Sequence, residues 1–414
     1  MDIKRTILIV ALAIVSYVMV LKWNQDYGQA ALPTQNTAAS TTNPGLPDGV
    51  PAGDSGAGAS ADVPSATAET HTADQAPVAV SKDLIRVKTD VLDLAIDPVG
   101  GDVVQLNLPQ YPRRQDHPDI PFQLFDNGGE RVYLAQSGLT GANGPDARST
   151  GRPLYAADQK RYQLADGQDQ LVVDLKFSDN GVNYIKRFSF KRGEYDLNVS
   201  YLIDNQSSQA WSGNMFAQLK RDASSDPSSS TATGTATYLG AALWTPSEPY
   251  KKVSMKDIDK GSLKENVSGG WVAWLQHYFV TAWIPAKSDN NVVQTRKDSQ
   301  GNYIIGYTGP AISVPAGGKA ETSAMLYAGP KIQSKLKELS PGLELTVDYG
   351  FLWFIAQPIF WLLQHIHSLL GNWGCSSRCP LPATVPWHVC VRSRPSSQRS
   401  RNASAMIARR CPRR

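Results

Sequence analysis

Alternation of hydrophobic and polar residues with a period of two dominates the middle of the chain. The longest run carries a hydrophobic residue at every second position: Tyr195, Leu197, Val199, Tyr201 and Ile203. Shorter runs lie at 92–97 and 173–178. Residues spaced by two point to one face of a strand, so these runs predict half-buried β-strands. Turn-forming residues separate the runs, and no helical periodicity of useful length interrupts 85–325. The pattern therefore predicts a mainly β fold with one large antiparallel domain.

An uninterrupted apolar run opens the chain, directly after Lys4 and Arg5. It predicts a transmembrane anchor built from Ile7, Leu8, Ile9, Val10, Leu12, Ile14, Val15, Val18, Val20 and Leu21. At about 1.5 Å per residue, the stretch from the start of this run to Trp23 covers roughly 25 Å, slightly less than a hydrocarbon core. The preceding cations favour a cytoplasmic amino terminus. A cleaved signal peptide is the alternative, because residues 28–30 (Gly-Gln-Ala) form a small-x-small cleavage pattern.

A second apolar stretch, residues 349–371, contains no Asp, Glu, Lys or Arg. At 100° per residue its polar side chains, Gln357, Gln364 and Ser368, fall on one line. The hydrophobic residues cluster on the opposite side: Leu352, Ile355, Ile359, Leu362, Leu363, Ile366 and Leu370. Such a pattern indicates an amphipathic helix lying in the membrane interface. A membrane-spanning helix and a helix buried in the β domain are the alternatives.

Composition changes sharply along the chain. Residues 28–80 contain no Phe, Trp, Tyr, Lys or Arg, which predicts a flexible tether. The predicted segments are a membrane anchor (1–27), a disordered linker (28–81), the β domain (82–330), a short helix with a connector (331–346), the interfacial helix (347–374) and a carboxyl-terminal tail (375–414). The formal net charge is +4, but the tail holds nine arginines and no acid, which leaves −5 for the first 374 residues. This distribution does not support nucleic-acid binding.

The tail, residues 375–414, has a composition of its own. It lacks Lys, Asp and Glu and is rich in Arg, Pro and Ser, which is typical of out-of-frame translation of a GC-rich gene. An arginine-rich arm for anionic lipid or nucleic acid is the alternative. All four cysteines of the chain lie here: Cys375, Cys379, Cys390 and Cys411. Three of them, together with His388, could in principle supply the four ligands of a zinc site. The surrounding sequence, however, predicts no folded structure that would hold these ligands in place.

No catalytic, metal-binding or cofactor-binding set stands out, and the sequence does not predict an enzyme. Phosphate-binding, nucleophile-elbow and dinucleotide-binding motifs are missing from the sequence. His365 and His367 are two apart, so on a helix they face different directions. His277 lies in an aromatic, strand-like run, residues 271–285, and is expected to be a hydrogen-bonded core histidine. Carboxylates on the predicted strands are expected to belong to solvated faces.

Long segments of the chain resemble one known family. Residues 1–25, 87–112, 269–285 and 347–374 are similar, in this order, to YidC-type membrane protein insertases of Gram-negative bacteria. The resemblance implies a bacterial inner-membrane protein with a cytoplasmic amino terminus, a periplasmic β-supersandwich domain and an interfacial helix. It also implies three kinds of partner, with no cofactor: inner-membrane lipid, nascent membrane proteins as substrates, and the Sec translocon with its accessory subunits.

The sequence departs from the family after Gly374. In the family this position leads into five further transmembrane helices, which form a hydrophilic groove with a basic residue, whereas here Cys375 begins the arginine-rich tail. The insertase helix bundle is missing, and no insertion by this chain alone is expected. A membrane-anchored periplasmic ligand- or carbohydrate-binding module is the alternative, with Trp211, Trp244 or Tyr250 exposed to stack on a sugar ring. Mutarotase-type enzymatic activity is a weaker third hypothesis.

Overall fold

The computed structural model describes residues 83–114, 117–129, 131–227, 238–347, 358–364 and 366. The chain divides into two compact units. One is Leu46–Val347, whose described part is a β domain. The other combines Met1–Gly45 with Asp348–Arg414, and its described part is a short helical segment at 358–366.

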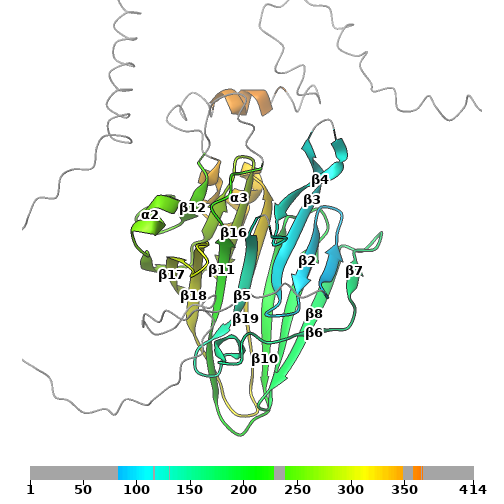
Figure 1. Ribbon diagram of the computed structural model, residues 1–414, viewed down its shortest axis with the longest axis vertical. Coiled ribbons are helices and arrows are strands. Elements are labelled where there is room, and N and C mark those ends of the chain that lie inside the picture. The colour runs from blue at the N-terminus through cyan, green and yellow to red at the C-terminus, as the bar shows by residue number, and fades with distance from the viewer. Residues whose placement is uncertain are drawn as a thin grey trace, which may run out of the picture. The chain divides into compact units, whose positions relative to one another are not determined.

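The β domain consists of two mainly antiparallel sheets, as the sequence predicts (Figure 1). The first sheet runs β14-β17-β18-β11-β5-β3-β2-β1-β7, with β4 paired to β3. Its strands are β1 (Ile85–Lys88), β2 (Asp93–Asp97), β3 (Asp102–Arg114), β4 (His117–Phe125), β5 (Tyr133–Thr140), β7 (Arg161–Gln163), β11 (Trp211–Arg221), β14 (Lys264–Ser268), β17 (Asn290–Lys297) and β18 (Tyr303–Val314).

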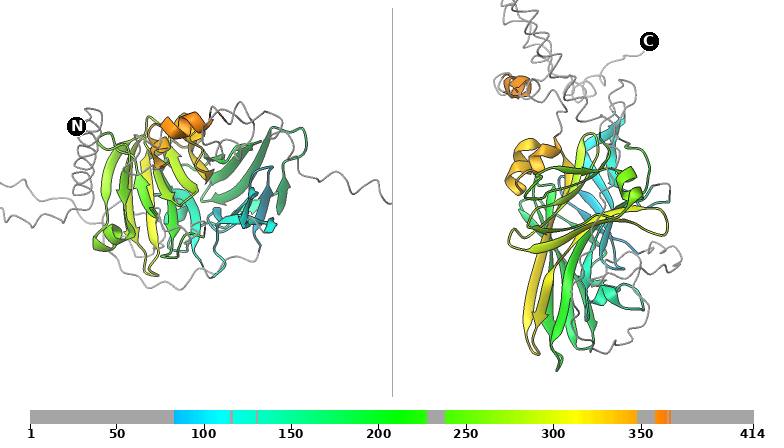
Figure 2. Two further views of the ribbon diagram at one scale, coloured as in Figure 1. Left: turned by 90° about the horizontal axis from the view of Figure 1, so that it is seen from above. Right: turned by 90° about the vertical axis from the view of Figure 1, so that its left-hand side faces the viewer.

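The second sheet runs β13-β12-β15-β16-β19-β10-β9-β8-β6. Its strands are β6 (Ala156–Ala157), β8 (Gln170–Asp179), β9 (Val182–Lys191), β10 (Asp196–Asn205), β12 (Gly240–Leu243), β13 (Lys251–Val253), β15 (Val272–Leu275), β16 (Phe279–Pro285) and β19 (Lys319–Pro330). Figure 2 shows the two layers from above. The helical elements of the domain are η1 (Pro145–Ala147), α2 (Met255–Lys260), α3 (Gln333–Leu339) and η3 (Leu343–Thr346).

Strand β10 shows how the alternating pattern produces the fold. It pairs with β9 on one side and with β19 on the other. Its residues Leu197, Val199, Tyr201 and Ile203 are fully buried. The predicted half-buried strand is confirmed here. In β2, by contrast, Ala95 and Asp97 are buried as well as Leu94 and Ile96, so both faces of that strand are covered.

The core between the sheets is rich in tryptophan. Trp271, Trp274 and Trp283 are among the largest fully buried side chains of the domain. Trp283 lies on β16 of the second sheet, and its Nε1 donates a hydrogen bond to the backbone oxygen of Gln218 on β11 of the first sheet, at 3.1 Å. This indole therefore links the two layers by packing and by a hydrogen bond.

The aromatic run 271–285 is a hairpin and not one continuous strand. It forms β15 and β16, which pair with each other, and the backbone N–H of Gln276 donates to the oxygen of Phe279 to close the turn. His277 lies in this turn and is only half-buried, so it is not the core histidine that the sequence suggests. The sequence run contains no Gly, Asn or Asp to mark the turn, which explains why the pattern was misleading.

Helix α2 interrupts the region where the sequence indicated strands only. Ser254 and Asp257 form a capping box in which the Ser254 side chain accepts from the Asp257 N–H and the Asp257 side chain accepts from the Ser254 N–H. Six residues are too few to show helical periodicity, so the S-x-x-D cap was the available signal.

Helix α3 and the η3 turn end the β domain. Leu336 and Leu343 are fully buried, and Trp271 Nε1 donates to the backbone oxygen of Pro341 at 3.2 Å. Gly342 has a φ of 79°, and a Cβ at this position would lie 2.8 Å from the oxygen of Pro249. Only glycine fits this left-handed and crowded position without strain.

Candidate functional site

Most of the predicted membrane-contacting residues lie outside the described part of the chain. This holds for the anchor at 7–21, for Lys4 and Arg5, and for Leu352, Ile355 and Leu370. In the described segment at 358–366, Ile359 and Leu362 are exposed, whereas Leu363 and Ile366 are half-buried. Among the described residues, no helix is long and apolar enough to cross a membrane.

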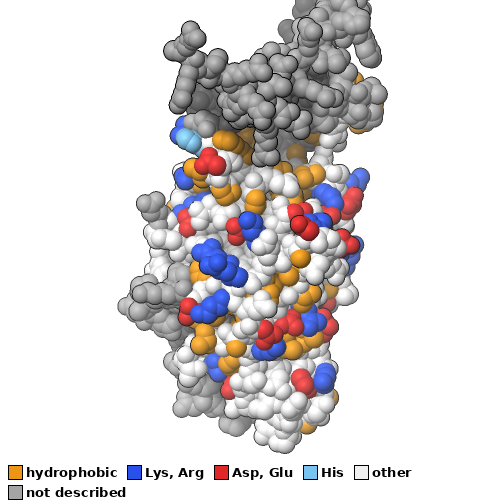
Figure 3. All heavy atoms as spheres, turned by 90° about the vertical axis from the view of Figure 1, so that its right-hand side faces the viewer, with side chains coloured by type: hydrophobic (Ala, Val, Ile, Leu, Met, Phe, Trp, Pro, Cys, Tyr) orange, Lys and Arg blue, Asp and Glu red, His pale blue; other side chains and the backbone are white. Residues whose placement is uncertain are grey.

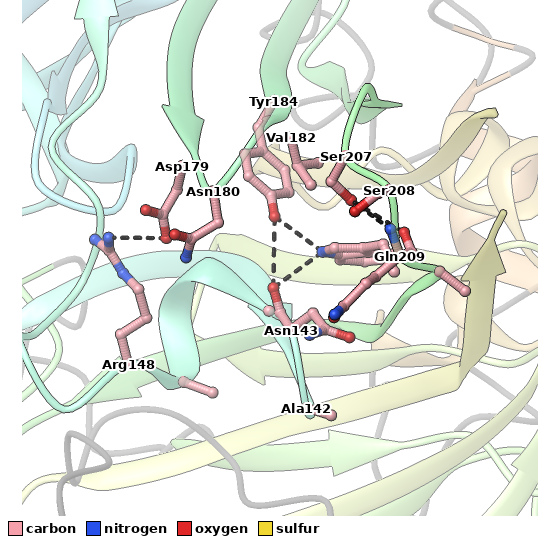
Figure 4. A pocket seen from close by; sticks show the side chains of 14 residues that line it. Ala142, Asn143, Arg148, Asp179, Asn180, Val182, Tyr184, Ser207, Ser208 and Gln209 are labelled. Atoms are coloured by element: carbon pink, nitrogen blue, oxygen red, sulfur yellow. Dashed lines mark hydrogen bonds and ion pairs between the residues drawn. The ribbon is translucent and has the colours of Figure 1, made fainter. Parts of the chain in front are cut away.

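A pocket of about 380 Å³ lies at one end of the β domain. It is built from the β5–η1 loop, the β8–β9 turn and the β10–β11 connection, and Figure 4 shows how their side chains converge. Its lining residues are Ala142, Asn143, Gly144, Ala147, Arg148, Asp179, Asn180, Val182, Tyr184, Ser207, Ser208, Gln209, Ala210 and Trp211. Asp204 on β10 pairs with Lys319 at the start of β19, so this end lies away from Pro330.

The main polar groups of the pocket bond to one another. Trp211 Nε1 donates to the backbone oxygen of Asn143 and to the hydroxyl of Tyr184, both at 2.9 Å. Arg148 Nη1 lies 3.3 Å from Asp179 Oδ2. Burial raises the pKa of Tyr184 to about 12, so its hydroxyl stays neutral near pH 7. These hydrogen bonds and this ion pair fix the positions of the side chains that line the pocket. The lining contains no nucleophile paired with a general base.

The aromatic residues proposed to stack on a sugar do not present exposed faces. Trp211 is only 2% exposed, which corrects the expectation that it is available to a ligand. Trp244 and Tyr250 are half-buried and pack against the hydrophobic core. A stacking platform needs an open ring face, so none of the three is a good candidate.

A cluster of four charged residues lies between the sheets: Asp102, Asp146, Arg152 and Lys186, here called the buried charge cluster. Arg152 forms an ion pair with Asp102, and its Nε donates to Asp146 Oδ1 at 2.8 Å. Lys186 Nζ donates to the backbone oxygens of Gly100 and Ser137, both at 3.0 Å. The cluster has two basic and two acidic side chains, and each of the four has a hydrogen-bond or ion-pair partner.

Burial dominates the electrostatics of this cluster. It lowers the pKa of Lys186 to about 7, although nearby Asp102 opposes the shift. Burial also raises the pKa of Asp146, and the charge of Arg152 works against that change. None of the four side chains is accessible to a substrate, so the cluster is a structural feature and not a catalytic one.

Carboxylates on strands were expected to belong to solvated faces, and Asp102 on β3, which is buried, shows where this fails. No expectation was made for Lys186, which is buried as well. In β9 the inward positions are Val182, Tyr184, Lys186, Phe188 and Phe190. Lys186 therefore occupies the middle of the row of inward-facing, buried positions on β9. The sequence signal for this buried lysine was its spacing: Lys186 lies two residues from Tyr184 and two from Phe188, so all three point to the same face of the strand.

Lys186 makes the stability of the β domain depend on pH. Because its folded pKa of about 7 lies below the ordinary 10.5, the unfolded state binds more protons between these two values. The contribution of Lys186 to stability is therefore lowest below about pH 7 and rises up to about pH 10.5. Relative to Lys186→Met, the unaltered chain should gain stability by at most about 1.4 kcal/mol per pH unit in this window. Thermal unfolding of both proteins at several pH values in this window measures the difference. If the stability of the two proteins changed with pH in the same way, the prediction would be wrong.

No group of three or more His, Cys, Asp or Glu side chains in the described ranges could hold a metal ion. The four cysteines and His388, which formed the only zinc pattern in the sequence, lie outside those ranges.

Comparison with known proteins adds a decisive observation. The family described as the YidC periplasmic domain matches residues 84–362, which include the whole two-sheet domain. The chain belongs to the YidC family. A Pseudomonas putida (strain W619) protein named membrane protein insertase YidC is 92% identical over 376 residues, covering 91% of this chain and 67% of the relative. The protein of the same name from Pseudomonas fluorescens (strain SBW25) is 80% identical over the same shares.

Among solved structures, a galactose mutarotase-like protein from Lactobacillus casei is similar at a low level. It is 9% identical with a TM-score of 0.39, and the match covers 59% of this chain and 99% of that protein. A likeness at this level does not inform function.

Proposed function

We propose that this chain acts as part of a membrane protein insertase, which assists insertion, folding and assembly of inner-membrane proteins, alone or with the Sec translocon. The observation that carries the proposal is the 92% identity over 376 residues to a protein named membrane protein insertase YidC. In this proposal the chain resides in the bacterial inner membrane with its amino terminus in the cytoplasm and its β domain in the periplasm. Its partners are inner-membrane lipid, nascent membrane proteins and the translocon.

Insertion needs no bond-making chemistry. A polar backbone group that crosses hydrocarbon without a partner costs several kcal/mol, and an insertase lowers that cost by offering a polar path. Both relatives described above carry the name membrane protein insertase. The carbohydrate-binding alternative is not favoured, since Trp211 is buried.

A chimera tests the proposal in cells depleted of their own insertase. Residues 1–374 of this chain are joined in frame to the remaining part of the Pseudomonas putida (strain W619) relative, and insertion of a dependent inner-membrane protein is measured. Because the two sequences are 92% identical over the matched region, the chimera should restore insertion to the level of the full-length relative.

The full-length relative is the positive control, and the 414-residue chain alone is the second arm. A chimera that accumulates in the membrane but fails to restore insertion would contradict the proposal. Restoration by the 414-residue chain alone would contradict the expectation that insertion requires the groove-forming helices of the family.

A further inference from the structure

Exposed hydrophobic side chains gather at one end of the β domain. Six large hydrophobic residues of the described β domain are exposed, and four of them lie at the end where the chain leaves at Val347. These four are Ile120, Tyr278, Ile332 and Leu345, here called the apolar rim. The other two are Leu154, which pairs with Val99 beside the β2–β3 turn, and Val172 on β8. Figure 3 shows hydrophobic side chains at the upper end of the face that it draws.

Contacts between distant segments hold the rim together. On β16, Phe279 stacks on Phe122 of β4 with ring centroids 4.3 Å apart, and it meets Tyr111 of β3 edge-on at 5.6 Å. The backbone N–H of Lys331 donates to the oxygen of Tyr278 at 3.0 Å. The β3–β4 hairpin, the β15–β16 turn and the start of α3 are therefore one continuous surface, and Figure 1 places them at the same end.

Ile120 points to the same side as this contact. It is two residues from Phe122 on β4, and residues spaced by two lie on one face of a strand. Phe122 is buried against Phe279, whereas Ile120 is 45% exposed. The apolar face of the hairpin therefore continues beyond the part that the rest of the domain covers.

The residue types of the rim suit a lipid interface. Tyr278, which is 60% exposed, has an apolar ring with a polar tip, and such side chains favour the headgroup level of a bilayer. Arg113 and Arg114 are exposed at the tip of the hairpin, beside these apolar side chains. Arginines at this level can reach anionic phosphates while their methylene stems pack on apolar neighbours.

The hairpin is poorly suited to pairing with another chain. Pro109, Pro112, Pro118 and Pro121 lie on β3 and β4, and proline has no backbone N–H to donate to an added strand. This argues against the apolar rim being covered by an added peptide strand or by a second copy of the chain. The exposed apolar character also continues in sequence beyond Val347, at Ile359, Trp361 and Leu362.

We propose that the apolar rim rests in the headgroup region of a phospholipid bilayer, with Ile120, Tyr278 and Ile332 in the interface and Arg113 and Arg114 at anionic headgroups. This places the β3–β4 hairpin against the membrane. The 380 Å³ pocket, at the end of the domain away from Pro330, stays open to water. The proposal rests on the proposed function only for the presence of a bilayer beside the domain.

Photo-cross-linking of the full chain in bacterial membranes tests this. A benzophenone amino acid replaces Ile120, Tyr278 or Ile332 in separate variants, and phospholipid adducts are measured by mass spectrometry. Leu154 is the matched control, because it is apolar and 66% exposed but lies away from the rim. Lipid adducts at the three rim positions should exceed those at Leu154 by about tenfold, since the interface places acyl chains and headgroups against the label. Equal yields at rim and control positions, or protein adducts in place of lipid adducts at the rim, would overturn the proposal.

A second arm tests the headgroup preference. The labelled chain is reconstituted into vesicles of zwitterionic lipid alone or with added anionic lipid, with and without Arg113→Gln. Lipid adducts at Tyr278 should rise with anionic lipid, and Arg113→Gln should lower that rise by about half because one of the two exposed arginines is lost. An unchanged yield would overturn the assignment of these arginines to anionic headgroups. If the rim positions gave no excess of lipid adducts in membranes while the chimera restored insertion, the bilayer contact would be rejected and the insertase proposal would remain.

Discussion

Replacing Arg152 with methionine is expected to destabilise the β domain by about 3–5 kcal/mol, because it removes the cation that pairs with two buried carboxylates. Arg152 bonds to both Asp102 and Asp146, and Asp146 is completely buried. Methionine fills part of the volume but donates no hydrogen bond. Chemical unfolding of the purified chain, followed by tryptophan fluorescence, measures the loss. The deficit should shrink at acidic pH, because burial already raises the pKa of Asp146 and protonation removes its charge.

Arg148→Met is the matched control for this substitution. Arg148 also pairs with an aspartate, Asp179, but both side chains are partly exposed, so water screens the interaction. Its loss should cost at most about 1 kcal/mol. Equal effects of the two substitutions would contradict the view that the buried charge cluster is held by Arg152.

Replacing Trp283 with alanine is expected to cost about 3–5 kcal/mol, the range for removing a large aromatic side chain from a packed core. Trp283 is 1% exposed and donates from β16 to the Gln218 oxygen on β11. The substitution therefore opens a cavity between the two sheets and leaves that oxygen without the indole donor. The free energy of unfolding, measured as above, reports the loss.

Two further substitutions separate the causes. Trp283→Phe keeps most of the apolar volume and removes the hydrogen bond, so it should cost clearly less than the alanine variant. Leu154→Ala changes an exposed residue and should alter stability by no more than about 0.5 kcal/mol. If Trp283→Ala were no more harmful than Leu154→Ala, the link between the two sheets would be unimportant for stability.

Local patterns predicted the strands well where one face is buried and the other is not. In β10 the alternating hydrophobic residues Leu197, Val199, Tyr201 and Ile203 are all buried, although Ser200 between them is buried too. The same reasoning was less successful at 271–285, because a hairpin turn without Gly, Asn or Asp leaves no sequence signal. It missed α2 because six residues are too short to show a helical period.

The family was indicated by the sequence, whereas the amphipathic face at 352–370 stays a prediction. The sequence did not indicate that Ile120, Tyr278 and Ile332 gather at one end. These residues are more than 200 positions apart in sequence at the extremes, and only the contacts of Phe279 with Phe122 and Tyr111 bring their segments together. The buried charge cluster was also missed because its four residues come from separate segments of the chain and are brought together only by the packing of the two sheets.

From the residue pattern alone we could infer the family, the mainly β class and a few of the strands, because the alternation of side chains along a strand is a local property. Which strands are neighbours follows from long-range packing, as where β10 pairs with β19 more than 100 residues later. The tertiary structure also decided that Lys186 and Arg152 are buried, because desolvation of a charge depends on what the opposite sheet places over it. Burial and long-range pairing are properties of the packed molecule, and a local pattern does not contain them.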